Sequence, residues 1–182
     1  MFIVRIVKGA DPRNYGSGKT GMTNVLRVAG KKAAAVVLIG DAGKGAIVIV
    51  VATVLTSNES IHAACGVASV MGHIWPVLTG FRGGRGIATG MGASVALEPW
   101  MLLLSFGAFL PVVYLTRFVS LGSIAGTFSV IISFGVMAIY GFQPLEYFLY
   151  ALVSGSLIVV MHRDNIKRLR RGTERRVGDR NS

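Results

Sequence analysis

The chain has 182 residues, of which 52% are hydrophobic, with a formal net charge of +11 and a single cysteine. Its mean hydropathy of +0.61 is too high for an ordinary soluble domain. The length predicts one domain, and one cysteine excludes an internal disulfide or a site built from several thiolates. The basic charge is compatible with three partners: nucleic acid, an anionic membrane surface or a phosphorylated substrate.

Residues 1–9, MFIVRIVKG, look like the inner end of a span that is too short to cross a membrane. We expect either that a preceding helix is missing or that Met1 is a late start, and we expect no signal peptide. The stretch GSGKTGMTN at 16–24 shares letters with a nucleotide-binding P-loop. Such a loop needs an earlier glycine where Arg13 stands, and a strand where KGADPRNY stands, so an ATP site is disfavoured.

Long apolar stretches then alternate with short polar breaks, at roughly 33–56, 61–80, 87–97, 100–116, 119–140 and 145–161. A helix that crosses the hydrocarbon core needs about 20 residues, and only 87–97 is clearly short. Pro99 favours a break after it, because proline cannot continue a helix without losing a hydrogen bond. The pattern predicts an all-α integral membrane protein, a bundle of about six transmembrane helices.

The charges predict the orientation of these spans. With six spans, one side of the membrane receives residues 1–32, the 81–86 loop, Arg117 and the tail, and with them every lysine and arginine except Lys44. The other side carries three glutamates: Glu59, Glu98 and Glu146. Positive residues mark the cytoplasmic side, so both termini are predicted to be cytoplasmic. The expected domain organisation is a single membrane-embedded domain over 1–182, with 162–182 as a basic cytoplasmic tail.

Three polar segments fall on that side, at 11–32, 80–90 and 162–176. In GFRGGRGIATG the glycines allow close backbone approach to a ligand, and a helix start and two arginines favour an anion such as phosphate. The alternative is a basic turn that holds lipid headgroups. Asn24 and Arg27 share a face if their stretch is helical. His162 is either a proton acceptor or an interfacial residue, and the later arginines suggest a membrane-binding tail.

Ionisable residues inside the spans are expensive and suggest function. Asp41 and Lys44 stand three apart, and their alternative role is to neutralise each other. His73 is expected to be a buried, hydrogen-bonded residue that faces the bundle. No cluster of acids, histidines and cysteines suits a metal, so the chemistry is expected to use cations, backbone amides and hydroxyls on a substrate with its own leaving group.

Four motifs in order, all on one predicted membrane face, resemble the bacterial acyl-phosphate:glycerol-3-phosphate acyltransferase family, the PlsY type. GSGxxGxTNVLR resembles its first motif and GHIWPVLTGFRGGRGIAT its second. RFVSLGSI is similar to a further stretch, and HRDNIKRL with GTE resembles the last. The resemblance covers nearly the whole chain.

The resemblance implies seven spans, of which the first is missing or truncated here, in the bacterial cytoplasmic membrane. It implies that a fatty acyl group passes from acyl phosphate to glycerol 3-phosphate, giving lysophosphatidate and phosphate in the first acylation of phospholipid biosynthesis. The implied partners are these two substrates, membrane lipid and, functionally, an enzyme that makes acyl phosphate. No cofactor, metal or nucleic acid is expected. The alternative function is a membrane transporter of a phosphorylated or other anionic small molecule.

The resemblance also implies site residues. The implied catalytic residues are Ser17, Arg27, Arg85, His162 and Asn165. The implied substrate-binding residues are Gly16, Gly18, Lys19, Thr23, Asn24, Arg82, Gly83, Gly84, Gly86, Ser120 and Ser123. The glycine loop and Arg85 would hold the acyl-phosphate group, whereas Arg27, His162 and Asn165 would hold glycerol 3-phosphate. The proton acceptor is left open between a side chain and the substrate's own phosphate.

The chain departs from the family pattern at a few positions. Lys19 stands where the family usually has Asn, and Arg82 and Arg85 replace lysines. Met161 replaces a usual arginine, and we hypothesise that Lys19 compensates for that lost charge.

Overall fold

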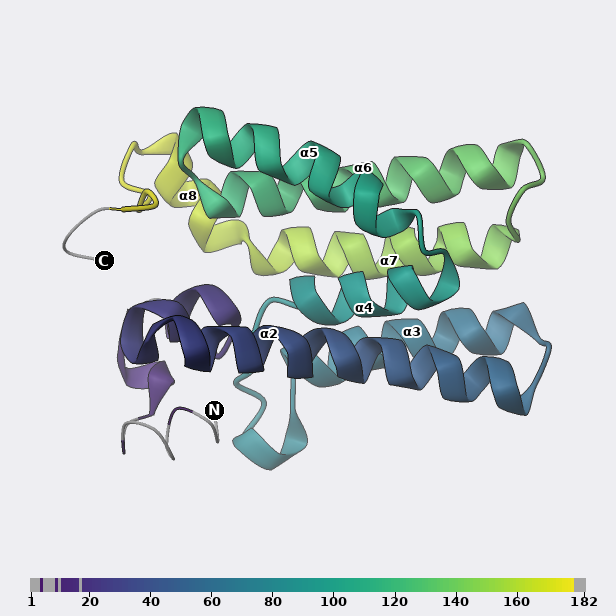
Figure 1. Cartoon of the computed structure of the whole chain (residues 1–182), viewed down its shortest axis with the longest axis horizontal. Helices are drawn as coiled ribbons and strands as arrows, with labels where there is room; N and C mark the ends of the chain where they lie inside the picture. The colour runs from purple at the N-terminus through teal and green to yellow at the C-terminus, as the bar shows by residue number, and fades with distance from the viewer. Residues whose placement is uncertain (1–3, 5–8, 10, 17, 179–182) are drawn as a thin grey trace.

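The computed structural model of the chain describes residues 4, 9, 11–16 and 18–178, and these fold into a bundle of helices (Figure 1). The long helices are α2 (Met22–Leu55), α3 (Glu59–Ile74), α4 (Ile87–Leu97), α5 (Met101–Thr116), α6 (Val119–Ile139) and α7 (Leu145–Met161). The short ones are η1 (Pro12–Asn14), η2 (Val77–Thr79) and α8 (Arg163–Arg170). Each apolar stretch identified in the sequence therefore contains a helix.

The helix ends follow local chemistry. Asn58 precedes α3, and its side chain accepts a hydrogen bond from the Ser60 amide at 3.0 Å, which satisfies a donor of the first turn. Pro99 lies in the break between α4 and α5, as expected, and Pro144 directly precedes α7. By length and composition, three of the described helical segments can cross a membrane, or four if α7 and α8 form one bent span. The number of spans therefore stays a prediction.

The first long helix differs from its predicted range. We expected a span over 33–56, but α2 begins at Met22 and continues to Leu55, with a break at Gly30, where φ is 81°. Glycine adopts this backbone conformation without steric cost. Hydropathy marks only the apolar part of a helix, so Arg27, Lys31 and Lys32 concealed its polar beginning. Asn24 and Arg27 therefore lie on a helix, which is the condition under which residues three apart share a face.

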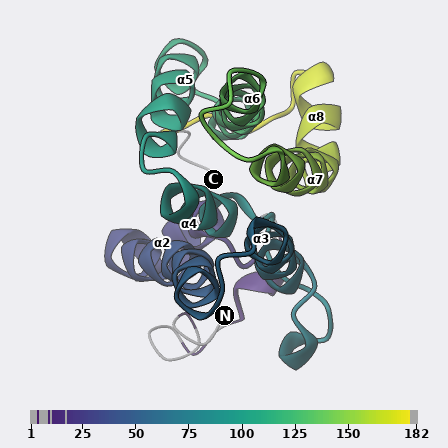
Figure 2. The ribbon, with the colours of Figure 1, turned by 90° about the vertical axis from the view of Figure 1, so that its right-hand side faces the viewer.

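The helices form two groups with α4 between them (Figure 2). On one side α2 and α3 pack together and against α4, and on the other α5, α6 and α7 pack in sequence. The backbones of α2 and α4 touch: a side chain at Gly45 would collide with the Thr89 carbonyl, and one at Gly92 with the Ala42 carbonyl. This contact leaves α4 little freedom to move relative to α2.

In the core of the bundle, α7 packs against both α4 and α6. Tyr150 is 1% exposed, and its hydroxyl donates to the Gly90 carbonyl of α4 at 2.9 Å. Phe134 of α6 packs edge-on against the Tyr150 ring. These contacts fix α4 against α7, and the polar segments of the sequence gather at the end of the bundle where α6 starts and α7 ends (Figure 1).

Candidate active site

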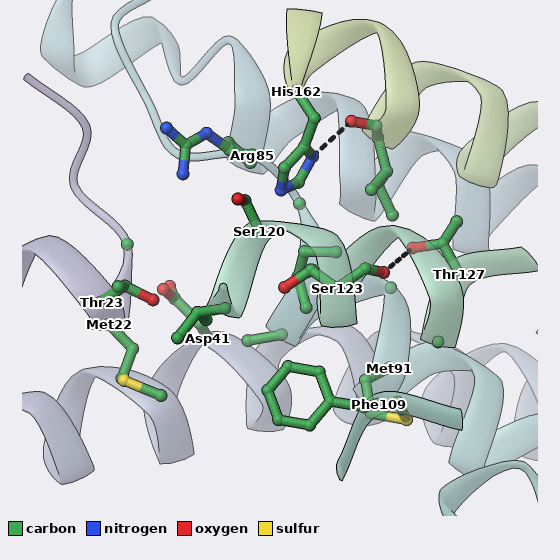
Figure 3. A pocket seen from close by; sticks show the side chains of 18 of the residues that line it. Met22, Thr23, Asp41, Arg85, Met91, Phe109, Ser120, Ser123, Thr127 and His162 are labelled. Atoms are coloured by element: carbon green, nitrogen blue, oxygen red, sulfur yellow. Dashed lines mark hydrogen bonds between the residues drawn. The ribbon is translucent and has the colours of Figure 1, made fainter. Parts of the chain in front are cut away.

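A cavity of about 500 Å³ lies between the two groups of helices. One end is polar and basic, and the charged residues that line the cavity are Lys19, Arg27, Asp41, Arg85, Arg168, Glu174 and Arg175. The other end is apolar and includes Met91, Phe106, Phe109 and Val130. Figure 3 shows side chains from both ends facing one continuous space. The cavity can therefore hold a molecule with an anionic head and a hydrocarbon tail.

Asn24 supports the loop that precedes α2. Its side chain is buried, and its Nδ2 donates to the carbonyls of Tyr15 at 3.1 Å and Lys19 at 2.9 Å. A side chain at Gly16 would collide with the Asn24 amide oxygen. The polar side chains of this segment thus close the loop against the helix, and Arg27, three residues on from Asn24, reaches the cavity.

The glycine loop, residues 80–86, precedes α4 and is held by hydrogen bonds to the end of α3. The Gly83 amide donates to the Ile74 carbonyl at 3.1 Å, and the Gly84 amide to the His73 carbonyl at 3.3 Å. A side chain at Gly83 would collide with the His73 carbonyl, and one at Gly84 with the imidazole ring. Gly86 has a φ of 91°, so it also requires glycine. These glycines therefore serve packing and backbone conformation.

The two arginines of this loop have different positions. Arg85 lines the cavity, and its Nε is buried with no hydrogen-bond partner among the described residues. Burial, reinforced by the charge of Arg168, lowers the pKa of Arg85. Arg82 is exposed and does not line the cavity. A half-buried guanidinium whose buried Nε has no partner among the described residues is suited to an anionic ligand.

His162 stands between α7 and α8 and is 2% exposed. Its Nδ1 donates to the Ile158 carbonyl at 2.8 Å, so the neutral ring carries its lone pair on Nε2 (Figure 3). Burial lowers the pKa of His162 to about 4, and the Ile158 bond opposes this change while the charge of Arg85 adds to it. At neutral pH the ring is therefore an uncharged hydrogen-bond acceptor.

Glu174 links its own segment to α6 and α8 at the basic end of the cavity. Its carboxylate accepts from Ser120 Oγ at 2.8 Å, Asn165 Nδ2 at 2.7 Å and Arg168 Nε at 2.7 Å. Burial opposes ionisation, but these hydrogen bonds outweigh it and hold the pKa of Glu174 below its usual value. Glu174 thereby fixes α8 against the start of α6.

The segment that follows Glu174 folds back against the turn between α5 and α6. The Val177 amide donates to the Arg117 carbonyl at 2.8 Å, and the Arg117 side chain returns a bond to the Val177 carbonyl at 2.6 Å. The Arg176 guanidinium lies 5.2 Å from the centre of the Phe118 ring. Residues 172–178 of the predicted tail thus form a strap at the basic end of the cavity, and Arg175 is one of the lining residues.

Most of the residues predicted from sequence meet in this cavity. Those that line it are Gly16, Lys19, Thr23, Asn24, Arg27, Arg85, Gly86, Ser120, Ser123, His162 and Asn165. Four predicted residues do not line it: Gly18, Arg82, Gly83 and Gly84. Ser17 lies outside the described residues. Arg168 and Glu174, which belong to the last of the four family motifs but were given no catalytic or binding role, also line the cavity, as does Arg175, which the site prediction did not include.

Comparison with known proteins identifies relatives of the chain. The family described as glycerol-3-phosphate acyltransferase matches residues 1–172. A glycerol-3-phosphate acyltransferase of Thermoanaerobacter sp. (strain X514) is 42% identical over 174 residues, which cover 96% of this chain and 85% of the relative. One of Synechococcus elongatus (strain ATCC 33912 / PCC 7942 / FACHB-805) is 42% identical over 184 residues, covering 97% of this chain and 86% of the relative.

Two solved structures have the same fold. Both are crystal structures of PlsY (YgiH), an integral membrane glycerol 3-phosphate acyltransferase, and both are 38% identical in sequence to this chain. The glycerol 3-phosphate form has a TM-score of 0.88 and covers 97% of this chain and 88% of its own. The lysophosphatidic acid form has a TM-score of 0.81 and covers 90% of this chain and 82% of its own.

Proposed function

The chain belongs to the glycerol-3-phosphate acyltransferase family, of the PlsY type, and on that premise we propose that its acyl donor is an acyl phosphate. It is an integral membrane enzyme that acylates glycerol 3-phosphate. One observation carries the proposal: a single cavity joins a cluster of guanidinium groups to an apolar compartment between helices. The phosphate of an acyl phosphate suits the guanidinium groups, and its hydrocarbon chain suits the apolar compartment.

Arg85 is the residue that best fits the phosphate of the donor. Its Nε is unused, and its guanidinium is directed into the space that His162 and Ser120 also face (Figure 3). In the transfer, the glycerol hydroxyl oxygen forms a bond to the acyl carbon, and the bond from that carbon to the phosphate oxygen breaks. Negative charge grows on the departing phosphate, and a fixed guanidinium stabilises it.

His162 and Asn165 are proposed to act on the other substrate, together with Arg27. The free Nε2 of His162 accepts a hydrogen bond, so it suits the glycerol hydroxyl rather than a phosphate oxygen. With a pKa of about 4, His162 is too weak a base to retain the hydroxyl proton at neutral pH. We therefore assign it the role of orienting the hydroxyl, whereas a substrate phosphate oxygen takes the proton.

The orientation in the membrane is proposed from charge. The beginning of α2 and α8 lie at the same end of the bundle (Figure 1), and the basic end of the cavity lies there too. The positive-inside rule then places the site and both termini on the cytoplasmic side. In a Cys65→Ser background, an impermeant maleimide applied to intact cells should label Ser57→Cys but not Arg171→Cys. The reverse pattern would refute this orientation.

The donor is tested with purified protein in lipid, glycerol 3-phosphate and either a long-chain acyl phosphate or the corresponding acyl-CoA. We expect equal amounts of lysophosphatidate and phosphate from acyl phosphate, and no product from acyl-CoA. Product from acyl-CoA alone would overturn the proposal.

The two loop arginines supply a matched pair of variants for the same assay. Arg85→Gln should lower kcat/KM about a hundredfold or more, because it removes a fixed charge from the departing phosphate. Arg82→Gln should remain near wild type, because Arg82 lies outside the cavity. Equal losses in both variants would contradict the assignment of Arg85.

A further inference from the structure

Three ionisable side chains meet between α2 and the end of α3, beside the glycine loop: His73 is buried, Asp41 is half-buried and the Lys44 side chain is 44% exposed. Lys44 Nζ lies 2.6 Å from Asp41 Oδ1 and 2.6 Å from His73 Nδ1, and Asp41 Oδ1 lies 3.4 Å from the same His73 nitrogen. The cluster joins α2 to the last turn of α3. Lys44 lies about 16 Å along α2 from its end at Leu55, which places its charge at membrane depth. Charged groups at that depth are energetically costly, so a charge there suggests a functional role.

Lys44 and Asp41 both approach one nitrogen of the histidine ring. Lys44 Nζ lies 2.6 Å and Asp41 Oδ1 3.4 Å from Nδ1 of His73, and an ammonium group at Lys44 can only donate to that nitrogen. The ring is nearly buried and lies directly against Gly84, where any side chain would collide with Nε2. The backbone carbonyl of His73 also accepts from the Gly84 amide. His73 therefore contacts the loop with both its ring and its main chain.

The loop carries Arg85 into the cavity. Gly83 and Gly84 donate hydrogen bonds to the end of α3, Gly86 directly precedes α4, and Arg85 lies between these supports. One residue beyond Lys44, α2 touches the first turn of α4 through Gly45 and Thr89. The loop is thus supported by His73 on one side and by the α2–α4 contact on the other.

We propose that Lys44 is a positioning residue for the acyl transfer: it holds the His73 ring under the glycine loop and thereby fixes Arg85 in the cavity. The proposal rests on the proposed role of Arg85 at a phosphate. The simpler explanation is that Lys44 neutralises Asp41. Neutralisation accounts for one of the two contacts of Lys44, and it predicts that removing both charges together is harmless.

The first experiment compares Lys44→Met, Lys44→Arg and the double variant Asp41→Asn/Lys44→Met in the acyl-phosphate assay. Lys44→Met should lower kcat/KM by between about tenfold and a hundredfold, the scale of a small misplacement of a reacting group. Lys44→Arg keeps a donor and should recover much of the activity. The double variant should remain impaired, and a double variant with wild-type activity would overturn the proposal. Lys32→Met is the matched control, because Lys32 lies on the same helix and, like Lys44, is exposed and outside the cavity.

The second experiment asks whether Lys44 acts through Arg85. In a double-mutant cycle, Lys44→Met should add little to the loss already caused by Arg85→Gln. Losses that multiply would overturn the proposal. If wild type itself fails with acyl phosphate, the proposed function is at fault, and the cycle is then run with whichever donor the enzyme uses.

A third readout reports on the loop without catalysis. Hydrogen exchange over residues 80–86 should be faster in Lys44→Met than in Lys32→Met, because the loop has lost a support. His73→Gln is a second variant that leaves the Asp41–Lys44 ion pair in place but removes the Nδ1 contact. It should show the same faster exchange. Unchanged exchange in both variants would overturn the proposal.

Discussion

His162 offers a test in which the stability of the protein reports the protonation of one group. The substitution is His162→Asn, whose Nδ2 can replace Nδ1 as the donor to the Ile158 carbonyl. The variant removes the titrating ring and retains the local hydrogen bond. Any difference in pH dependence between the two proteins then belongs to His162.

The magnitude follows from the pKa of the group. The pKa of His162 is about 4 in the folded protein, against its ordinary value of 6.5. Between these values the unfolded chain binds a proton that the folded protein does not, so stability falls as pH drops from 6.5 to 4. Above 6.5 and below 4 this group contributes no slope. The loss over the whole window is about 3 kcal/mol, or roughly 10 °C in Tm for a chain of this size.

The assay is thermal unfolding of both proteins in one detergent, at steps of pH from 8 to 4. The difference in Tm between wild type and His162→Asn should be constant above pH 6.5 and should change steadily below it, with wild type losing more. If the two proteins keep a constant difference down to pH 4, the ring is already charged or accessible in the folded state. The proposed role of Nε2 as a neutral acceptor would then be wrong.

Two further predictions concern packing and the strap. Gly66→Ala on α3 should lower stability by about 1–3 kcal/mol, because its methyl group would lie 2.7 Å from the Tyr150 ring. Gly72→Ala on the same helix has nothing within 4 Å and should be neutral or stabilising, so equal changes in Tm would refute this reasoning. Glu174→Gln should weaken the strap by about 1–2 kcal/mol, since one amide cannot accept from every donor that the carboxylate serves. Tryptic cleavage after Arg175 should then be faster than in wild type, and an unchanged rate would contradict this role.

The structure also separates predictions that looked equivalent in sequence. Arg82 and Arg85 occur in one basic, glycine-rich loop, and composition cannot distinguish them. Gly86, with its φ of 91°, and the hydrogen bonds of Gly83 and Gly84 to α3 decide that Arg85 is directed into the cavity. For His73 and the Asp41–Lys44 pair, too, the sequence could not show which side chains meet. His73 was expected to be hydrogen-bonded and mutual neutralisation was one of two roles considered for Asp41 and Lys44, but the contact among all three depends on how α2 packs against α3.

The amino-acid sequence by itself determined the class of protein, the helical stretches and the four motifs of the family. These properties are local: an apolar run of sufficient length favours a helix in lipid wherever it occurs, and a motif is read from neighbouring residues. Only the tertiary structure decided that residues 172–178 fold back on the start of α6 and that Lys44 reaches His73, 29 positions away. Such contacts depend on the rotation and register of packed helices, which hydrophobicity along one helix does not specify.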